Sequence, residues 1–467
     1  MTYLSTRKGL AATSAETIFQ GLAPDGGLYV PAELPDIGGR LAAADTLRAA
    51  EEAVMGTLFD DLPEAVRAEA IDRLLSRFPA ADPIPLVARD GLHLLELFHG
   101  RTGAFKDVAL SMLPVLMRHA AGGRRVLVLT VTSGDTGSSA MQGFAGVDGT
   151  EIVVFYPATG TSRIQRLQMT TPADPNVHAV GIRGNFDDAQ SAVKRVFADP
   201  AIAAAAAARG VTLSSANSIN TGRLVPQIAY YALACSRLRA PAVDVVVPSG
   251  NFGNILAAYY AKLLGSPIRR LVVASNVNDV LARFVASGVY DPGDRFTVTN
   301  SPSMDIRKSS NVERLLWLLN DGDCGEVARL MRDLDEKGRY QLTPAAAARL
   351  RADFVGGVAT PEETEAEMRR LRASCGYLVD PHTAVATRVA KALGYPKDGV
   401  PCVVAATATP YKFPETCRRA FGEDVLRDPP ASIRDLERLP VVQTRVVNVA
   451  DIPQVVVDTF GRAAGQA

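Results

Sequence analysis

The sequence predicts an α/β protein whose parallel sheets are covered by helices on both faces. Short runs of Val, Ile and Leu recur along the chain, and each is followed by a Gly- or Ser-containing turn and then by a helical pattern. Continuous apolar runs are typical of strands buried on both faces, and their alternation with helices favours a parallel sheet. The 467 residues are too many for one simple core and are enough for two or three lobes.

The first part of the chain is predicted to be a separate N-terminal domain over residues 1–82. It contains an Asp-Gly-Gly turn and a helical spacing of apolar residues over 47–78, and three prolines within 78–86 indicate a linker behind it. The buried strands that follow are expected over 93–98, 124–132, 150–157, 243–248, 269–275 and 400–407.

Helices are also predicted in the alanine run 201–208 and in the charged region 311–375. The alanine run 201–208 is expected to be a helix rather than a disordered segment, because Ala is the best helix former and Gly210 stops the run. Residues 311–375 have charged, amphipathic patterns, and we expect Asn311 and Thr360 to cap two helices there.

The composition argues against several classes of protein. Lys plus Arg and Asp plus Glu each total 50, so the zero net charge gives no support for a nucleic-acid or acidic-membrane partner. The five cysteines lie far apart, and none forms a CxxC pair, which favours reduced thiols over disulfides or a zinc site. The N-terminus lacks the apolar core of a signal peptide, and no apolar run reaches the ~20 residues of a membrane span. We therefore expect a soluble cytoplasmic protein without a bound metal.

Three Gly/Ser turns each follow an apolar strand and open a helix, which is where ligands bind in open α/β sheets. "PSGNFGN" (248–254) is the best phosphate candidate, because Gly250 and Gly253 let backbone amides approach an anion and Asn254 adds a donor. The turn lacks the ending of a nucleotide P-loop and the GxGxxG spacing of a dinucleotide site. Taken alone, a plain strand-to-helix connection capped by Ser249 is an equal alternative.

The other two turns also have simpler interpretations. "TSGDTGSS" (132–139) could bind a substrate carboxylate or a cofactor hydroxyl, although Asp135 at a helix start is slightly more typical of a cap. "SSANSINTGRL" (214–224) is more commonly a polar turn, but Arg223 has the forked donors that suit a phosphate.

Lys106 follows Phe105 at the point where a glycine-containing turn becomes an apolar helix. Most lysines in such a setting lie along the surface with the ammonium group in water. In an apolar pocket the cation loses its solvation, its pKa falls, and the amine becomes a better nucleophile towards aldehydes. Together with a phosphate-sized loop and a second anion loop, such a lysine suggests pyridoxal phosphate (PLP).

Several motifs resemble one family over nearly the whole chain. They are "YLSTRKG", "GLAPDGGLYVP", "GAFKD", "TSGDTG", "GNFDDAQ", "SANSIN", "PSGNFGN", "SPSMDIRKSSNVERLLW" and "DPHTAVA". In these motifs the sequence resembles the threonine synthases, PLP-dependent enzymes with the fold of the tryptophan-synthase β subunit. The resemblance implies a two-lobed enzyme of fold type II. It would use PLP to convert O-phosphohomoserine and water into threonine and phosphate, the last step of threonine biosynthesis.

The resemblance also implies how the catalytic module, residues 83–467, is divided. The expected parts are a large lobe of 83–108, 223–310 and 376–467, a small mobile lobe of 109–222, and a helical insertion of 311–375. Nothing in the sequence decides between a monomer and a homodimer.

Roles for single residues follow from the same resemblance. Lys106 is implied to be the catalytic lysine that forms a Schiff base with PLP, Asp135 to lie near the phenolic oxygen of PLP, and Thr407 to meet its pyridine nitrogen. The cofactor phosphate is implied to lie on the turn formed by Gly250, Asn251, Phe252, Gly253 and Asn254.

The substrate is implied to be held by two of the loops. Ser133 and Thr136 would bind its carboxylate, and the implied phosphate ligands are Asn217, Ser218 and Arg223.

Three residues depart from the family pattern. Arg101 stands where the family has proline, Thr409 where it has histidine, and Lys308 where it has a less charged residue. The first alternative to a threonine synthase is therefore a related β- or γ-replacement with another amino acid or nucleophile. The second is a non-catalytic binding protein, against which the retention of Lys106 and Thr407 argues.

Overall fold

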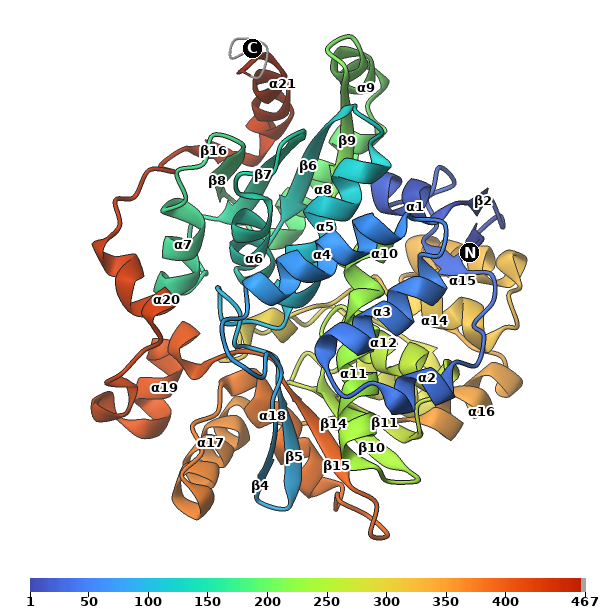
Figure 1. The fold of residues 1–467 in the computed structure, drawn as a ribbon, viewed down its shortest axis with the longest axis vertical. Coiled ribbons are helices and arrows are strands. Elements are labelled where there is room, and N and C mark those ends of the chain that lie inside the picture. Colours follow the sequence, from blue (N-terminus) through green and yellow to red (C-terminus); the bar gives the residue numbers. More distant parts are fainter. Residues whose placement is uncertain (463–467) are drawn as a thin grey trace.

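The computed structural model describes residues 1–462 and contains two lobes, each built around a sheet (Figure 1). The strand order is β14-β11-β10-β15-β5-β4 in a six-stranded sheet and β16-β8-β7-β6-β9 in a five-stranded sheet. Within these two sheets every neighbouring pair is parallel except β4 and β5. The predicted α/β class with parallel sheets is confirmed. The last residues of the expected module, 463–467, lie outside the described part.

The six-stranded sheet forms the large lobe. Its strands are β4 (Leu86–Arg89), β5 (Leu92–Glu96), β10 (Val243–Pro248), β11 (Ile268–Ser275), β14 (Phe354–Val358) and β15 (Cys402–Ala406). Its helices include α11 (Pro226–Leu238), α12 (Gly253–Leu263), α13 (Val280–Ser287), α18 (Pro381–Ala392) and α19 (Pro414–Phe421). Val245 and Val247 pack into one apolar cluster, whereas Val246 packs into another, because side chains alternate between the two covered faces.

The five-stranded sheet forms the small lobe. Its strands are β6 (Arg125–Val131), β7 (Thr150–Pro157), β8 (Val177–Arg183), β9 (Val211–Ser215) and β16 (Val446–Asn448). Helices of this part of the chain are α5 (Lys106–Ala120), α6 (Asp135–Phe144), α7 (Arg163–Thr170), α8 (Phe186–Ala198) and α9 (Pro200–Ala207). The alanine run does form helix α9, which Asp199 caps by accepting a hydrogen bond from the Ala201 N–H at 2.8 Å.

The expected lobe boundaries are wrong at the C-terminal end. Strand β16 pairs with β8 of the small lobe, and α21 (Ile452–Arg462) buries Val455 and Val456 in the small-lobe core. Residues 446–462 therefore belong to the small lobe and not, as expected for 376–467, to the large one. The insertion 311–375 is also not purely helical, because it contributes β14 to the edge of the six-stranded sheet.

The N-terminal part packs on both α5 and α11, and so contacts both lobes, while the insertion packs on the large lobe (Figure 1). The N-terminal elements are β1 (Tyr3–Ser5), β2 (Ala11–Ala12), α1 (Ser14–Gln20), β3 (Tyr29–Pro31), α2 (Gly38–Ala43), α3 (Leu47–Leu58) and α4 (Glu64–Ser76). The elements leading into and within the insertion are β12 (Val289–Tyr290), α14 (Val312–Leu319), α15 (Cys324–Lys337), β13 (Tyr340–Gln341), α16 (Pro344–Asp353) and α17 (Pro361–Cys375). Helices α3 and α4 share one apolar cluster with α5 and α11, so residues 1–82 have no core separate from the catalytic module.

One of the two predicted helix caps is wrong. Thr360 caps α17 in a capping box, as expected. Asn311 precedes α14 without making a cap bond, because its Oδ1 accepts from Arg314 Nη1 at 2.5 Å instead. Its Nδ2 donates to Ser218 Oγ at 3.0 Å and to the Asn251 carbonyl at 3.1 Å. Its side chain thus joins two of the predicted site loops.

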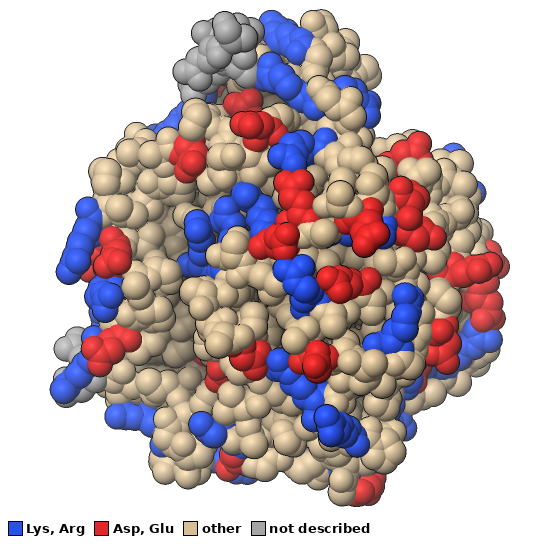
Figure 2. Space-filling model, viewed as in Figure 1, with Lys and Arg blue, Asp and Glu red and all other residues tan. Residues whose placement is uncertain are grey.

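The surface and the thiols add little to the functional question. Acidic and basic side chains are interspersed over most of the face shown in Figure 2. All five cysteines are free thiols. Within residues 1–462, no helix is long and apolar enough to cross a bilayer, and no group of His, Cys, Asp and Glu is arranged to hold a metal ion.

Candidate active site

A cleft of about 1540 Å³ lies where the strands of both sheets end. Loops after β6 and β9 of the small lobe and after β10 and β15 of the large lobe line it, which is the position expected for ligand sites in parallel sheets. All the site residues predicted from the sequence line this cleft: Lys106, Ser133, Asp135, Thr136, Asn217, Ser218, Arg223, Gly250, Asn251, Phe252, Gly253, Asn254 and Thr407.

Lys106 is the first residue of α5 and lies in the cleft wall. The turn before it is tied to the end of β15, because the Phe105 N–H donates to the Thr407 carbonyl at 2.9 Å. The Lys106 side chain is only 14% exposed, and its Nζ lies 5.2 Å from the centre of the Phe105 ring. Burial lowers the pKa of Lys106 below its usual value, and the Lys412 and Arg223 charges act in the same direction while Asp135 opposes them. The alternative of a surface lysine is therefore wrong.

Asp135 is the first residue of α6, but it does not cap this helix. Thr132 satisfies the helix start, since its Oγ1 accepts hydrogen bonds from the Gly134 and Gly137 N–H groups at 2.9 Å each. The Asp135 carboxylate points into the site instead. Its Oδ2 lies 3.4 Å from Lys106 Nζ and accepts a hydrogen bond from Ser303 Oγ at 3.0 Å. The capping interpretation of Asp135 is wrong.

The second carboxylate oxygen of Asp135 has its own partners. Oδ1 lies 2.9 Å from Lys412 Nζ and accepts from Gln165 Nε2 at 2.9 Å. Burial alone would raise the pKa of Asp135, but the neighbouring charges of Lys412, Lys106 and His382 hold it well below its usual value. The floor of the cleft therefore contains an ionised carboxylate between two lysines.

The turn 248–254 opens α12 with an unusual backbone. Phe252 adopts a left-handed conformation (φ +64°), and no side chain caps the helix, because Ser249 Oγ donates to the Val247 carbonyl. Asn254 Oδ1 accepts hydrogen bonds from the hydroxyls of Tyr230 and Tyr231 at 2.5 and 2.7 Å. The buried Asn254 Nδ2 has no partner within the described chain, and the first N–H groups of α12 lie beside it. The alternative of a turn capped by serine is wrong.

The loop after β9 presents further unpaired donors and acceptors. Arg223 is buried, and one of its terminal nitrogens donates to the Ala216 carbonyl at 2.6 Å. Among the residues that the structure describes, Arg223 Nε and Asn217 Oδ1 have no hydrogen-bond partner. Burial lowers the pKa of Arg223 to about 10. Buried polar groups are normally satisfied, so these atoms indicate a ligand or ordered water in the cleft.

Sequence reasoning did not identify several residues of the site. They are Lys412, Gln165, Ser303, His382, Arg7 and Glu313. The His382 ring accepts from the Ser303 N–H at Nε2 (3.1 Å) and contacts Asp380 at Nδ1 (2.9 Å). Four of them, Arg7, Ser303, Glu313 and His382, lie within the motifs that carry the family resemblance. Lys412 also gave a usable signal, since it lies beside Phe413 in an apolar stretch, as Lys106 lies beside Phe105.

The three residues expected to depart from the family pattern lie in different places. Lys308 lines the cleft, whereas Arg101 is exposed on the turn before Lys106. Thr409 is buried and packs over that turn, because its methyl group lies 2.6 Å from the position a Cβ would take on Gly103.

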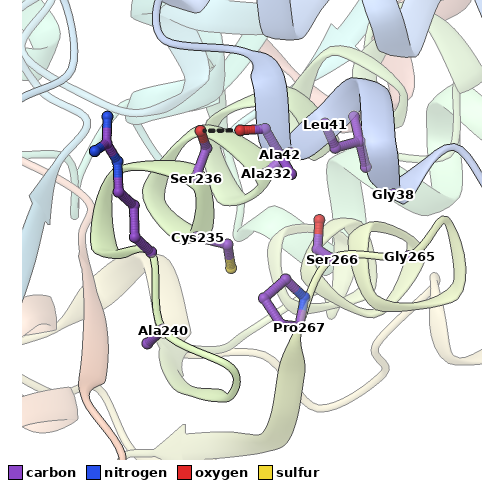
Figure 3. A pocket seen from close by; sticks show the side chains of 11 residues that line it. Gly38, Leu41, Ala42, Ala232, Cys235, Ser236, Ala240, Gly265, Ser266 and Pro267 are labelled. Atoms are coloured by element: carbon purple, nitrogen blue, oxygen red, sulfur yellow. Dashed lines mark hydrogen bonds between the residues drawn. The ribbon is translucent and has the colours of Figure 1, made fainter.

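A second, smaller hollow of about 270 Å³ lies between α2 and α11 (Figure 3). It is apolar, and the Cys235 thiol beside it has its pKa raised to about 12 by burial, so it is a poor nucleophile. None of the predicted site residues lines this hollow. We therefore place the chemistry in the large cleft.

Comparisons with known proteins agree with this geometry. The family described as pyridoxal-phosphate dependent enzymes matches residues 86–407, and the threonine synthase N-terminal and C-terminal families match residues 2–72 and 383–456. Threonine synthase of Pseudomonas aeruginosa is 37% identical, with 96% of this chain and 97% of that protein aligned. Human threonine synthase-like 1 is 36% identical over 90% of this chain and 61% of that protein.

Solved structures show the same relationship. The crystal structure of PLP-bound threonine synthase from Brucella melitensis superposes with a TM-score of 0.91 at 36% identity, covering 99% of this chain and 100% of that one. The chain belongs to the threonine synthase family of pyridoxal-phosphate-dependent enzymes.

Proposed function

We propose that this protein is a threonine synthase that converts O-phosphohomoserine and water into threonine and inorganic phosphate, with PLP held in the cleft. The observation that supports this most strongly is the placement of Lys106. Its buried amine, with a lowered pKa, lies in the same cleft as the turn that opens α12 and beside an ionised carboxylate. An enzyme that binds the aldehyde and the phosphate of PLP needs an amine and an anion-binding turn in one cleft.

The residues present fit PLP. Its aldehyde requires an amine, which Lys106 supplies. Its phosphate requires donors, and the free N–H groups at the start of α12 and the unpaired Asn254 Nδ2 supply them. The Thr407 hydroxyl would face the pyridine nitrogen and Asp135 would lie near the phenolic oxygen. When bound, PLP supplies an electron sink for the carbanions formed at the substrate.

The chain's own residues would carry out the remaining work. The Lys106 amine can take up and return protons at the α and β carbons of the substrate, because its lowered pKa leaves more of it neutral. Ser133 and Thr136, at the mouth of the turn after β6, would hold the substrate carboxylate. Arg223 and Asn217, whose buried atoms lack partners in residues 1–462, would stabilise the charge that grows on the departing phosphate together with Ser218.

A second candidate keeps the cofactor but changes the reaction to another β- or γ-replacement. Lys308 favours it, because this expected departure from the family pattern lines the cleft and would add a cation where the substrate binds. The human relative that is named only threonine synthase-like has nearly the same identity to this chain. The two candidates differ in whether phosphate release is accompanied by threonine.

The test is to incubate the purified full-length protein, loaded with PLP, with O-phosphohomoserine and to measure threonine and phosphate together. Equal amounts of both are expected, and Lys106→Ala should abolish turnover and the absorption band of the bound cofactor. Phosphate without threonine would favour the second candidate. A colourless protein that PLP cannot reconstitute would refute both.

A further inference from the structure

We infer that Lys412 is a positioning residue of this reaction: it holds Asp135 as an ionised carboxylate and so keeps the Lys106 nitrogen free to lose its proton. Lys412 belongs to the short helix η2 (Pro410–Lys412), which follows β15. The inference rests on the proposed function, because it concerns how Lys106 is prepared for its role.

Lys412 is buried, and Asp135 is the carboxylate that pairs with it. Its side chain is 0% exposed, which is rare for lysine unless the charge is paired. Nζ lies 2.9 Å from Asp135 Oδ1 and 3.4 Å from Ser138 Oγ. The backbone is also fixed, since the Lys412 N–H donates to the Thr409 carbonyl and the Lys412 carbonyl accepts from Ser162 Oγ at 2.8 Å.

The two oxygens of Asp135 are divided between the two lysines. Oδ1 has Lys412 at 2.9 Å and the Gln165 amide, and Oδ2 has Lys106 at 3.4 Å and the Ser303 hydroxyl. Lys412 is thus the closer cation to the Asp135 carboxylate, and Lys106 is the more distant one. Asp135 remains compensated when the Lys106 nitrogen turns away or loses its proton, because Lys412 does not move with it.

The other charged groups around Lys106 and Asp135 also shift the pKa values of these two residues. Arg223 of α10 (Thr221–Leu224) faces Lys106, and His382 of α18 faces Asp135 and is held by Asp380. Asp135 raises the pKa of Lys106, whereas Lys412 and Arg223 lower it. If Lys412 were absent, Asp135 would have Lys106 as its main counter-ion, and the Lys106 nitrogen would hold its proton more tightly.

The experiment uses the full-length protein loaded with PLP. The absorption band of the bound cofactor is recorded against pH, and its midpoint reports protonation of the Lys106 nitrogen. Lys412→Met is expected to raise the midpoint by about one pH unit or more, a tenfold change in proton affinity. Lys412→Arg keeps the cation and should restore a midpoint close to that of the wild type.

A matched control removes a paired lysine elsewhere. Lys262, in the last turn of α12, lies 2.6 Å from Asp353, and Lys262→Met should leave the midpoint unchanged. Lys412→Gln provides a second variant in case Lys412→Met does not fold, because it keeps a donor to Asp135 and removes only the charge.

The outcomes separate this inference from the proposed function. A wild-type protein with the cofactor band and threonine formation, but with an unchanged midpoint in folded Lys412→Met or Lys412→Gln, would refute the role of Lys412 alone. The role is refuted equally if neither variant folds while Lys412→Arg does, because Lys412 would then be purely structural. A wild type without the band or the product would refute the proposed function itself.

Discussion

Two glycine-to-alanine substitutions should change stability in opposite directions. A Cβ added to Gly250 would lie 2.8 Å from the Ser303 carbonyl oxygen and 3.1 Å from Ile306 Cγ1, so the backbone of the 302–306 segment has to move. A Cβ added to Gly56, inside α3, has nothing within 4 Å. We expect Gly250→Ala to destabilise the fold by about 1–3 kcal/mol and Gly56→Ala to stabilise it by about 0.4–1 kcal/mol.

The Gly250 substitution should also damage catalysis. Ser303 donates from its hydroxyl to Asp135 and from its N–H to His382, and displacement of this residue would loosen both bonds. A misplacement of about 1 Å at an active site can cost about 100-fold, so we expect a loss of turnover between about 10- and 100-fold.

The assay compares thermal unfolding and turnover of the two alanine variants, each loaded with PLP. Gly56→Ala serves as the control, because it makes the same chemical change at a residue that does not line the cleft. Unfolding midpoints that move in the same direction for both variants, or full activity in Gly250→Ala, would refute the close packing of the 302–306 segment on the turn.

Three further results are expected. Arg223→Lys should raise KM for O-phosphohomoserine about 10- to 100-fold, since a lost hydrogen bond to a charged group is worth about 1.5–3 kcal/mol; an unchanged KM would exclude Arg223 from the substrate site. Glu51 is fully buried, and neither of its carboxyl oxygens has a partner within residues 1–462, so burial raises its pKa well above the usual value. The folded protein then keeps a proton that the unfolded chain releases, and stability falls as pH rises. Glu51→Met should therefore stabilise the protein by about 1–3 kcal/mol and weaken this pH dependence, as thermal unfolding at pH 6 and pH 8 would show. Finally, residues 133–136 and 217–223 should move towards the cofactor when a substrate analogue binds, and two crystal structures that superpose without lobe displacement would contradict this closure.

Much of the fold follows from local patterns. The six predicted strands are present because each is a continuous apolar run, and the alanine run forms α9 because Pro200 starts it and Asp199 caps it. Local patterns could not predict that β16 belongs to the small-lobe sheet. Its three residues give no periodicity, and its pairing with β8 joins residues more than 250 positions apart.

The site was predictable only where residue type and turn chemistry coincide. Lys106 and the 248–254 turn are conspicuous in the sequence, because a lysine in an apolar stretch and a Gly-rich turn after a strand are both unusual. The partners of Asp135 are not, since Gln165, Ser303 and Lys412 come from three distant segments that meet only after folding. The failure of Asn311 as a cap has a local cause, because its Oδ1 accepts from Arg314 Nη1, three residues further along the chain. Its Nδ2 bonds to Ser218 and Asn251 are tertiary, and a local pattern cannot show them.

The most direct test is to reduce the PLP-loaded protein with borohydride, digest it and locate the pyridoxyl group by mass spectrometry. We expect the group on Lys106 Nζ. Two other lysines are internal controls and should remain unmodified: Lys308 lines the same cleft, and Lys412 lies next to Asp135. A pyridoxyl group on either of these lysines, or on no lysine at all, would contradict the assignment of Lys106 as the residue that binds the cofactor.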